Sequence, residues 1–449
     1  MQDTIVAIAT PEGTGALGII RISGPESWDI IKKATEYSSD FTPRKTLLLR
    51  FFDSDKRLLD RAVVTAYRAP KSYTGEDLVE ITCHGGQEVL RAVLNRLLSL
   101  GARTAEPGEF SKRAFINGKM SLDQAEAVVH LIEARTQTAV RAAARLMDGG
   151  LKGRLGLLRQ KLLEMLTLVE LGLDFIEEGH ELETKEVTGE KVSSVLNEVD
   201  SLLKQYRAGR FIRDGALIVI GGEPNSGKST LLNHLIGYDR AIVSETPGTT
   251  RDYIDVTQDW HGIPVRVYDT AGLRDTTDQI ESEGTRRSHE LFEIADIVVW
   301  LMSPPGFIPP PDKLTGRDHL FTVINKSDLL SMINIEEDIT STGFTETIKC
   351  RISAKFSDGI EDLRSQITEH LLMGYDPNDL LLVEGRHSDL LQEAKEALQS
   401  AKEALSRNSG LELVATDLHI ALNSVGEITG AVSSQDLLNE IFSRFCVGK

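Results

Sequence analysis

The sequence has few cysteines and no long apolar run. Its three cysteines, Cys83, Cys350 and Cys446, lie far apart and follow neither a zinc-ligand spacing nor a disulfide pattern. This sparse use of cysteine suits a reducing cytoplasm, where we expect the protein to work. No apolar stretch approaches the ~20 residues that span a bilayer. The chain begins without a basic leader and apolar run, so we expect no signal peptide.

Positive charge is also scarce. The chain has 50 Lys and Arg residues against 68 Asp and Glu residues, and its formal net charge is -18. Proteins that bind nucleic acid through their overall charge need clustered Lys and Arg, so the acidic net charge argues against binding of this kind. An RNA partner would therefore be held by a local basic patch or through a partner protein.

Proline is absent between Pro107 and Pro224, and again from Asn378 to the end. Both stretches carry Leu-rich and Ala-rich patterns with helical spacing. Ser121 and Gln124 form a capping box at the start of a helix predicted to run to Thr136. The other predicted helices cover residues 158–173, 192–206, 390–405, 413–423 and 437–445. Insertions at loop tips are well tolerated, so we interpret residues 119–213 and 376–449 as one discontinuous helix bundle around an inserted domain.

The remaining segments mix strands with helices, and 449 residues suffice for about three domains. Residues 1–118 are predicted to form an α+β domain with a helix at 88–100 and strands at 4–9, 17–22, 62–67 and 78–82. Residues 214–375 are predicted to form the inserted α/β domain. Its strands, which alternate with helices around a mainly parallel sheet, are expected at 216–221, 265–269, 297–302 and 320–325.

A phosphate-binding loop follows the first strand of the inserted domain. The segment Gly222-Glu223-Pro224-Asn225-Ser226-Gly227-Lys228-Ser229 matches the P-loop pattern between a strand and a helix. Its backbone N–H groups and the helix N-terminus can surround phosphates. Lys228 is expected to reach the β- and γ-phosphates, and the Ser229 hydroxyl to bind Mg²⁺. The predicted nucleotide-binding residues here are Asn225, Ser226, Gly227, Lys228, Ser229 and Thr230.

A second phosphate motif, Asp269-Thr270-Ala271-Gly272, ends the next predicted strand. Asp269 is expected to hold Mg²⁺ through water, and the Gly272 N–H to lie near the γ-phosphate. Many small GTPases place a glutamine next, where it orients the attacking water, but this chain has Leu273. Hydrolysis must therefore use another group.

Two short motifs select the base. Asp328, in Asn325-Lys326-Ser327-Asp328, can accept hydrogen bonds from the N1–H and N2 amino groups of guanine, whereas adenine lacks that pair of donors. Ser353-Ala354-Lys355 is expected to complete the base pocket with a backbone N–H. In this order after a P-loop, the motifs predict a guanine-nucleotide-binding GTPase.

A switch loop is expected between the two phosphate motifs. Thr250, in Pro247-Gly248-Thr249-Thr250-Arg251-Asp252, is expected to close over the γ-phosphate and join Ser229 as a Mg²⁺ ligand.

The whole chain resembles the family of the tRNA modification GTPase MnmE, also called TrmE. The terminal Cys446-Val447-Gly448-Lys449 is its most diagnostic mark, although the family usually has isoleucine at the position of Val447. Beside the P-loop and the Pro247–Asp252 segment, the matching motifs are Thr4-Ile5-Val6-Ala7, Gly18-Ile19-Ile20-Arg21-Ile22-Ser23-Gly24, Tyr73-Thr74-Gly75-Glu76-Asp77, Cys83-His84-Gly85-Gly86, Pro107-Gly108-Glu109-Phe110-Ser111 and Asn117-Gly118-Lys119-Met120.

The resemblance implies GTP hydrolysis without an arginine finger. Two G domains meet across their nucleotides, and a potassium ion takes the place of the finger. The implied K⁺ ligands, three of which also border GTP, are Asn225, Ser244, Thr246 and Thr249. Ser244 and Thr246 would contribute backbone carbonyls. Glu281 matches the family's catalytic glutamate, which acts through water; by itself it would be a solvated surface residue.

The resemblance also implies that the N-terminal domain binds 5-formyl-tetrahydrofolate or a related one-carbon tetrahydrofolate and mediates a homodimer. The matching contact positions are Arg21, Glu80, Lys119 and Lys449. Glu76 is the alternative to Glu80, since a small slip in alignment exchanges them. Cys446 is either a small buried thiol, the commonest role of cysteine, or a catalytic or positioning group near the folate.

Proteins of this family work with the flavoprotein MnmG (GidA) in a heterotetramer. Together they add an aminomethyl or carboxymethylaminomethyl group to C5 of the wobble uridine of certain tRNAs. Two alternatives remain from the sequence: an Era-like ribosome-assembly GTPase switch, and a folate-dependent one-carbon transferase with a regulatory G domain. The expected cofactors are GTP/GDP, Mg²⁺, K⁺ and the folate.

Overall fold

The computed structural model describes residues 3–174, 181–237, 257–269, 290–304, 307–332, 348–380, 384–407, 410–431 and 434–448. The chain divides into two compact units. The first comprises Met1–Val129, Met147–Val195 and Glu396–Lys449, and the second comprises His130–Leu146 and Leu196–Lys395. Within the described ranges, a bilayer-spanning helix is not found.

A six-stranded sheet forms the N-terminal part of the first unit, in the order β3-β4-β5-β2-β1-β6. Every pairing is antiparallel except that of β1 with β6. The strands are β1 Ile5–Ile8, β2 Leu17–Ser23, β3 Thr46–Phe52, β4 Leu58–Tyr67, β5 Leu78–His84 and β6 Arg103–Thr104, and the helices are α1 Ser27–Thr35, α2 Gln87–Ser99 and α3 Glu109–Ile116. The predicted α+β organisation is confirmed, although β3, β6, α1 and α3 are not predicted by the sequence.

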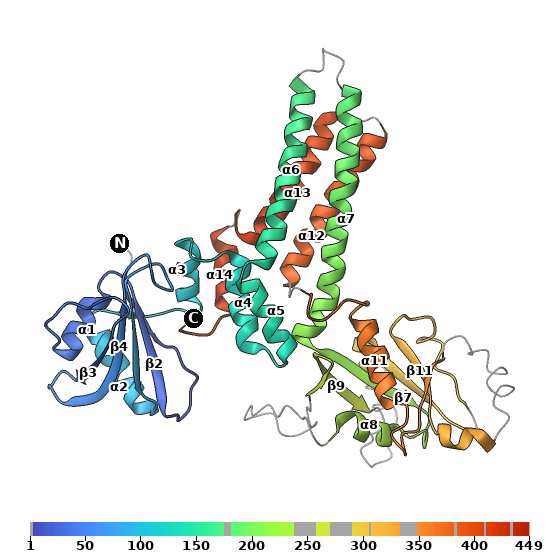
Figure 1. The fold of residues 1–449 in the computed structure, drawn as a ribbon, viewed down its shortest axis with the longest axis horizontal. Coiled ribbons are helices and arrows are strands. Elements are labelled where there is room, and N and C mark those ends of the chain that lie inside the picture. The colour runs from blue at the N-terminus through green and yellow to red at the C-terminus, as the bar shows by residue number, and fades with distance from the viewer. Residues whose placement is uncertain are drawn as a thin grey trace. The chain divides into compact units, whose positions relative to one another are not determined.

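One face of this sheet packs against α1 and α2 (Figure 1). Alternate residues of β4, such as Ala62 and Val64, are buried there with Trp28 of α1 and Val93 of α2. The strand period of two sends the intervening residues to the opposite face.

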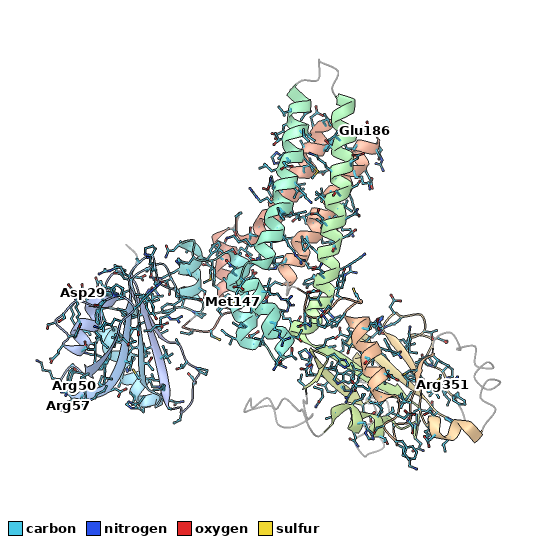
Figure 2. The ribbon with its side chains drawn as sticks, in the orientation of Figure 1. Asp29, Arg50, Arg57, Met147, Glu186 and Arg351 are labelled. Carbon is cyan, nitrogen blue, oxygen red and sulfur yellow. The ribbon has the colours of Figure 1, made fainter. Side chains whose placement is uncertain are left out.

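The opposite face of the sheet carries exposed apolar residues. Leu48 is 68% exposed and lies directly opposite Val63, which is 41% exposed. Arg50 and Arg61 are the next pair on this face of the two strands, and both are exposed. Figure 2 labels Arg50 together with Arg57, which lies in the turn between β3 and β4. This edge of the sheet is therefore both apolar and locally basic in an acidic chain.

Buried Arg113 ties α3 to the start of the chain. Its guanidinium contacts Glu109 at 2.9 Å, Glu76 at 3.1 Å and Asp3 at 2.8 Å. The hydrogen bond from Arg103, opposed by burial and aided by Arg113, lowers the pKa of Asp3 to about 2. Glu76 thus belongs to an internal ion-pair network that fixes α3 against β1.

Helices from two distant stretches of the chain pack together in the first unit, where α6 lies along α13 (Figure 1). The helices outside the N-terminal sheet and the inserted domain are α4 Leu122–Glu133, α5 Gln137–Met147, α6 Gly150–Asp174, α7 Glu181–Asp214, α12 Gly385–Ser406, α13 Leu411–Thr429 and α14 Gln435–Ser443. The predicted bundle interrupted by an inserted domain is confirmed, and α6 and α7 are longer than predicted.

The predicted helix from Ser121 to Thr136 is wrong at its end. Gln124 Oε1 does accept the Ser121 N–H at 2.9 Å, as in a capping box. However, α4 ends at Glu133, and Thr136 begins α5 by accepting the Ala139 N–H at 3.1 Å. The Thr136 hydroxyl also donates to the carbonyl of Gly262 at 3.0 Å, a contact outside the helix that local periodicity cannot reveal.

The inserted domain lies in the second unit and is built on a six-stranded sheet in the order β12-β11-β10-β7-β9-β8. Only the β8–β9 pair is antiparallel, so the predicted mainly parallel α/β domain is confirmed. Its elements are β7 Ala216–Gly222, α8 Lys228–Ile236, β8 Thr257–Trp260, β9 Ile263–Asp269, β10 Ile297–Met302, β11 Leu320–Ile324, the 3₁₀ helix η3 Ser327–Met332, β12 Ile348–Arg351 and α11 Ile360–Leu371. The parallel strands bring their carboxyl ends to one edge.

The two connections to the inserted domain are tied together. Arg213 lies in the last turn of α7, just before the domain, and its Nη1 lies 3.4 Å from Glu384, which stands just before α12. The other Glu384 oxygen lies 2.8 Å from Nε2 of buried His130. Burial raises the pKa of Glu384, but the hydrogen bond and charge of His130, with the charge of Arg213, outweigh it and lower the pKa to about 2.

Glu384→Gln is expected to lower the free energy of unfolding at pH 7 by on the order of 2 kcal/mol, because the carboxylate is the charge that holds both partners. A carboxyl with a depressed folded-state pKa stabilises fully above its unfolded value of 4.5 and loses that contribution as the pH falls toward 2. Urea unfolding of the wild type and of Glu384→Gln at several pH values between 2 and 7 measures the difference in their free energies of unfolding.

Glu403→Gln is the matched control, since the Glu403 side chain is 64% exposed and its ion pair is with Arg407, four residues along and just beyond the end of α12. Equal stability of the two variants at pH 7 would contradict the role assigned to Glu384.

Candidate functional site

The P-loop adopts a backbone that suits its sequence. It leaves β7 at Gly222 with φ 138°, turns at Asn225 with φ 64°, and reaches Gly227 with φ 98° at the start of α8. Glycine and asparagine are the residues that adopt positive φ most readily. Buried Lys228 folds back over the loop, where its Nζ donates to the carbonyls of Gly222 and Glu223 at 2.9 and 2.8 Å.

Asn325 joins the P-loop to the base-binding loop. Its Nδ2 donates to the Ser226 carbonyl at 2.8 Å, and its Oδ1 accepts the Ala354 N–H at 2.9 Å. The side chain is 2% exposed, so both bonds are made away from water. A Cβ added at Gly227 would lie 2.2 Å from Nδ2, which explains why glycine stands there. Sequence reasoning predicted Asn325 as a GTP-binding residue but not this bridge, which no local motif reveals.

The two predicted magnesium elements meet. Ser229 lies in the first turn of α8 and Asp269 ends β9, and the Ser229 hydroxyl donates to Asp269 Oδ2 at 2.9 Å. Both groups supply hard oxygen atoms, the ligands that Mg²⁺ prefers. Ser229 is exposed and Asp269 half-buried, so an ion has access to them. The residues that the structure describes therefore fit a Mg²⁺ ion held directly by Ser229 and through water by Asp269.

The base-selecting residues also come together. Ser353 Oγ donates to Asp328 Oδ1 at 2.6 Å, which fixes the orientation of the carboxylate. Ser327 N–H bonds to the Ile352 carbonyl at 3.0 Å and holds the two loops side by side. Lys326 has φ 61°, an uncommon conformation for a lysine that recurs at functional loops. Lys355 is exposed beside this site, with its Nζ 5.0 Å from the centre of the Phe356 ring.

Several predicted site residues lie outside the described residues. They are Ser244, Thr246, Thr249, Thr250, Thr270, Ala271, Gly272, Glu281 and Lys449. Their predicted roles remain predictions. Leu273 also lies outside the described residues, so the expectation that hydrolysis uses a group other than a glutamine remains a prediction as well. Thr230 is described and exposed in the first turn of α8.

The N-terminal sheet brings Arg21 and Glu80 together. They face each other across β2 and β5, and Arg21 Nε and Nη2 donate to Glu80 Oε1 at 3.1 and 2.8 Å. Tyr67 donates to the other oxygen at 3.4 Å. The guanidinium lies 4.9 Å from the ring centre of Tyr73 and 5.8 Å from that of Phe110. Sequence reasoning missed these two aromatic neighbours, although Tyr73 and Phe110 each lie in a motif it singled out.

The C-terminal tail reaches the same place within the first unit. The Gly448 carbonyl accepts a hydrogen bond from Arg21 Nη1 at 3.5 Å, and the Cys446 carbonyl accepts the Gly108 N–H at 3.4 Å. Cys446 is exposed, so its interpretation as a small buried thiol is wrong. The sequence cannot show that the tail leaves this side chain at the surface.

Exposed Lys119 lies beside the loop that carries Tyr73. A Cβ added at Gly75 would stand 3.2 Å from Lys119 Cγ, so glycine makes room for the lysine stem. Of the two candidate glutamates, Glu80 contacts Arg21, whereas Glu76 is buried against Arg113. The described residues thus bring Arg21, Glu80 and the tail together, and they place Lys119 beside Gly75 of the loop that carries Tyr73.

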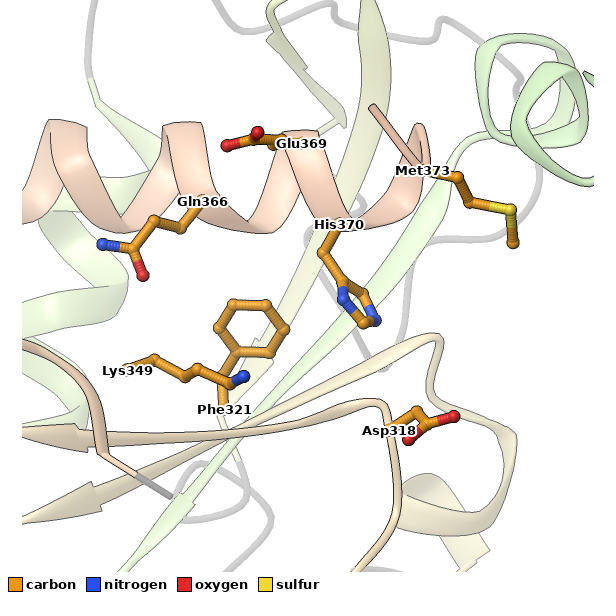
Figure 3. A pocket seen from close by; sticks show the side chains of 7 residues that line it. All are labelled: Asp318, Phe321, Lys349, Gln366, Glu369, His370 and Met373. Atoms are coloured by element: carbon orange, nitrogen blue, oxygen red, sulfur yellow. The ribbon is translucent and has the colours of Figure 1, made fainter. Parts of the chain in front are cut away.

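A separate hollow of about 570 Å³ lies at the other end of the parallel strands (Figure 3). Asp318 and Phe321 stand at the amino end of β11, and Lys349 at that of β12. His370 of α11 meets Phe321 edge-on, with ring centres 5.3 Å apart, and burial followed by Lys349 lowers the pKa of His370. This hollow is remote from the strand ends that carry Asn325 and Ser353, and it is not part of the nucleotide site.

Comparison with known proteins matches two family models. Residues 4–119 match the N-terminus of the GTP-binding protein TrmE, and residues 122–446 match the MnmE helical domain. The tRNA modification GTPase MnmE of Carboxydothermus hydrogenoformans is 39% identical over the full length of both chains, and that of Thermotoga maritima is 41% identical, also over both full lengths.

Among solved structures, the G domain of the T. maritima FeoB iron transporter is 20% identical and covers 34% of this chain and 98% of its own. Its TM-score is 0.24. The two family models and the full-length relatives agree with each other. The chain belongs to the family of the tRNA modification GTPase MnmE.

Proposed function

We propose that this chain is a potassium-dependent GTPase that helps to install a C5 group on the tRNA wobble uridine with a folate one-carbon unit. Membership of the MnmE family makes it a GTP hydrolase of tRNA modification. The proposal that the chain binds and hydrolyses GTP rests on two sets of contacts. Ser229 bonds to Asp269, and Asn325 bonds to both the P-loop and the loop at Ala354. The full-length match to these relatives favours tRNA modification over the Era-like alternative.

The nucleotide chemistry rests on positioned charges. The P-loop N–H groups and Lys228 would hold the phosphates, while Ser229, Asp269 and Thr250 would hold Mg²⁺, which offsets charge on the transferred phosphoryl group. Asp328, oriented by Ser353, would read guanine. The other proposed contacts to GTP are those of Thr230, Ser244, Thr249, Thr270, Ala271, Gly272, Lys326, Ala354 and Lys355.

Potassium would supply the positive charge that an arginine finger gives other GTPases. Asn225 is exposed at the tip of the P-loop and offers an amide oxygen, a suitable ligand for K⁺. Ser244, Thr246 and Thr249 would complete the ion's shell, and Glu281 would act on the attacking water. This arrangement accounts for Leu273 in the place of a water-orienting glutamine.

The folate would bind beside β2. Arg21, Lys119 and Lys449 suit the glutamate carboxylates of such a molecule, and Glu80 suits its pterin donors. Two observations support this placement: the Arg21 guanidinium lies close to two aromatic rings, and the C-terminal tail reaches it. Exposed Cys446 would then stand close to the folate as a catalytic or positioning group.

The proposed assembly is a homodimer joined to the flavoprotein MnmG. The exposed apolar pair Leu48 and Val63 supports a protein contact on the uncovered sheet face. The Arg50–Arg61 pair on the same face offers a local positive charge to tRNA, and the flavoprotein would provide further contacts. We also propose a cytoplasmic location and the domain boundaries 1–118, 119–213, 214–375 and 376–449.

Asn325→Leu is expected to weaken GDP binding by at least about tenfold, because it leaves the Ser226 carbonyl and the Ala354 N–H buried without partners. Calorimetric titration with GDP measures the affinity. Asn233→Ala removes an exposed amide from α8 of the same domain and should leave the affinity unchanged. If the two variants bound GDP equally well, the bridge would not be what positions the P-loop.

GTP hydrolysis is expected to be at least about tenfold faster in KCl than in NaCl at equal ionic strength, since only the larger ion completes the proposed site. Asn225→Ala should abolish the difference by removing one ligand. Phosphate release gives the rate in each salt. Equal rates of the wild type in the two salts would eliminate the potassium proposal while leaving the GTPase assignment intact.

Deletion of this gene is expected to remove the C5-modified wobble uridines from tRNA, as measured by mass spectrometry of tRNA nucleosides. The wild-type gene should restore them, whereas Lys228→Ala, which lacks the phosphate-binding amine, and Arg21→Ala, which lacks the proposed folate contact, should not. If Arg21→Ala restored the modified uridines while Lys228→Ala did not, the proposed role of the folate would be refuted. Unchanged wobble uridines in the deletion strain would refute the whole function.

A further inference from the structure

Three side chains form a row across the uncovered face of the N-terminal sheet. Arg50 of β3 lies directly opposite Arg61 of β4. Val63 of β4 pairs with Thr82 of β5, so Arg61 and His84 are the next residues on the same face of these two antiparallel strands. All three side chains are exposed. Arg50, Arg61 and His84 are therefore neighbours on adjacent strands, and we call them the basic row.

The two arginines of the basic row repel each other. Like charges directly opposite each other on antiparallel strands destabilise a sheet. Among the described residues, neither guanidinium has an ion pair or a hydrogen bond. The acids of the turn between β3 and β4 are engaged elsewhere: Asp53 Oδ1 accepts the N–H groups of Asp55 and Arg57 at 2.9 and 2.8 Å, and Asp55 lies 3.7 Å from the Arg57 guanidinium. An anion from outside the chain would relieve the repulsion.

His84 offers a hydrogen-bond acceptor beside these cations. Its side chain is 71% exposed, and its Nδ1 lies 2.6 Å from Oδ1 of Asp60, which is 8% exposed. Burial raises the pKa of Asp60, but hydrogen bonds from the His84 backbone N–H, the His84 ring and the Arg61 N–H outweigh burial and lower the pKa. Asp60 is therefore a carboxylate, which can only accept hydrogen bonds, so Nδ1 carries the proton of the neutral ring and Nε2 is left as an acceptor. The motif Cys83-His84-Gly85-Gly86 has no part in the proposed function above.

We propose that the basic row binds one ribose-phosphate unit of an RNA backbone, with Arg50 and Arg61 on the phosphate and His84 Nε2 on the ribose 2′-hydroxyl. Arginine suits phosphate because its N–H groups make charge-assisted hydrogen bonds. In RNA, neighbouring carbons of the ribose carry the 2′-hydroxyl and the 3′-phosphate, which matches groups on adjacent strands about 4.8 Å apart. DNA lacks this hydroxyl, so His84 gives the site a preference for RNA.

Binding of a fluorescent oligouridylate and of its 2′-deoxy counterpart to the full chain at pH 8 and low salt tests the phosphate contact. Arg61→Gln is expected to weaken binding of both probes by at least about fivefold and to reduce the salt dependence, because it removes one contact to phosphate. Arg91→Gln is the matched control, since Arg91 is 61% exposed on α2, which packs against the other face of the sheet. It should leave both affinities unchanged.

The ratio of the two affinities tests the role of His84. The wild type is expected to bind the oligouridylate at least about threefold more tightly than the 2′-deoxy probe, because only the former donates to Nε2. His84→Phe keeps a ring without the acceptor, so it should bring the ratio close to one and leave binding of the 2′-deoxy probe unchanged. A 2′-O-methyl probe keeps the oxygen but lacks its proton, and it should bind like the 2′-deoxy probe. A general loss of structure would instead weaken all probes together.

Equal affinity of the wild type for RNA and 2′-deoxy probes, or an RNA preference that survives His84→Phe, would overturn the proposal. So would a site for free phosphate alone, in which sodium phosphate binds the wild type but not Arg61→Gln, while the oligouridylate binds both equally. The inference rests on the proposed function only for the identity of the RNA as tRNA. If the wobble uridines survived deletion of the gene while the probes behaved as expected, the proposed function would fail and the RNA site would stand.

Discussion

The nucleotide site depends on the side-chain amide of Asn325. It bonds to the P-loop on one side and to the Ser353-Ala354-Lys355 loop on the other, and it does so in the protein interior. An amide can donate and accept at once, which a carboxylate or an alkyl group of the same size cannot. Gly227 leaves room for the contact, and Asp328 lies three residues further along. Phosphate recognition and base recognition are therefore parts of one hydrogen-bonded structure.

The inserted domain imposes a second constraint, because its two connections must stay close together. Arg213 and Glu384 meet although about 170 residues separate them, and His130 holds the same carboxylate. Helices α6 and α13, which lie on opposite sides of the insertion in sequence, pack along each other in the first unit. These contacts are long-range, so they form only when the flanking helices and the inserted domain have folded.

The candidate folate site shows how one side chain serves several purposes. Arg21 pairs with Glu80 through the register of β2 and β5, lies close to the rings of Tyr73 and Phe110, and donates a hydrogen bond to the C-terminal tail. The pairing keeps a half-buried cation in a defined orientation. It also places an acidic group beside a basic one, as a ligand with both carboxylates and amino donors would need. The diagnostic tail and the N-terminal sheet are thus neighbours in the first unit.

The sequence by itself determined the elements and motifs whose contacts are local. We could predict the P-loop, the motifs at Asp269 and Asn325 that follow strands, and the helical segments that flank the inserted domain. Each of these features depends on residues a few positions apart. Tertiary structure alone decided what depends on distant partners. Strand register pairs Glu80 with Arg21, whereas Glu76 is buried against Arg113. Long-range contacts also end α4 before Thr136 and join Asn325 to the P-loop, and the folded tail leaves Cys446 exposed. These outcomes follow from which segments pack together, and a linear pattern carries no record of that packing.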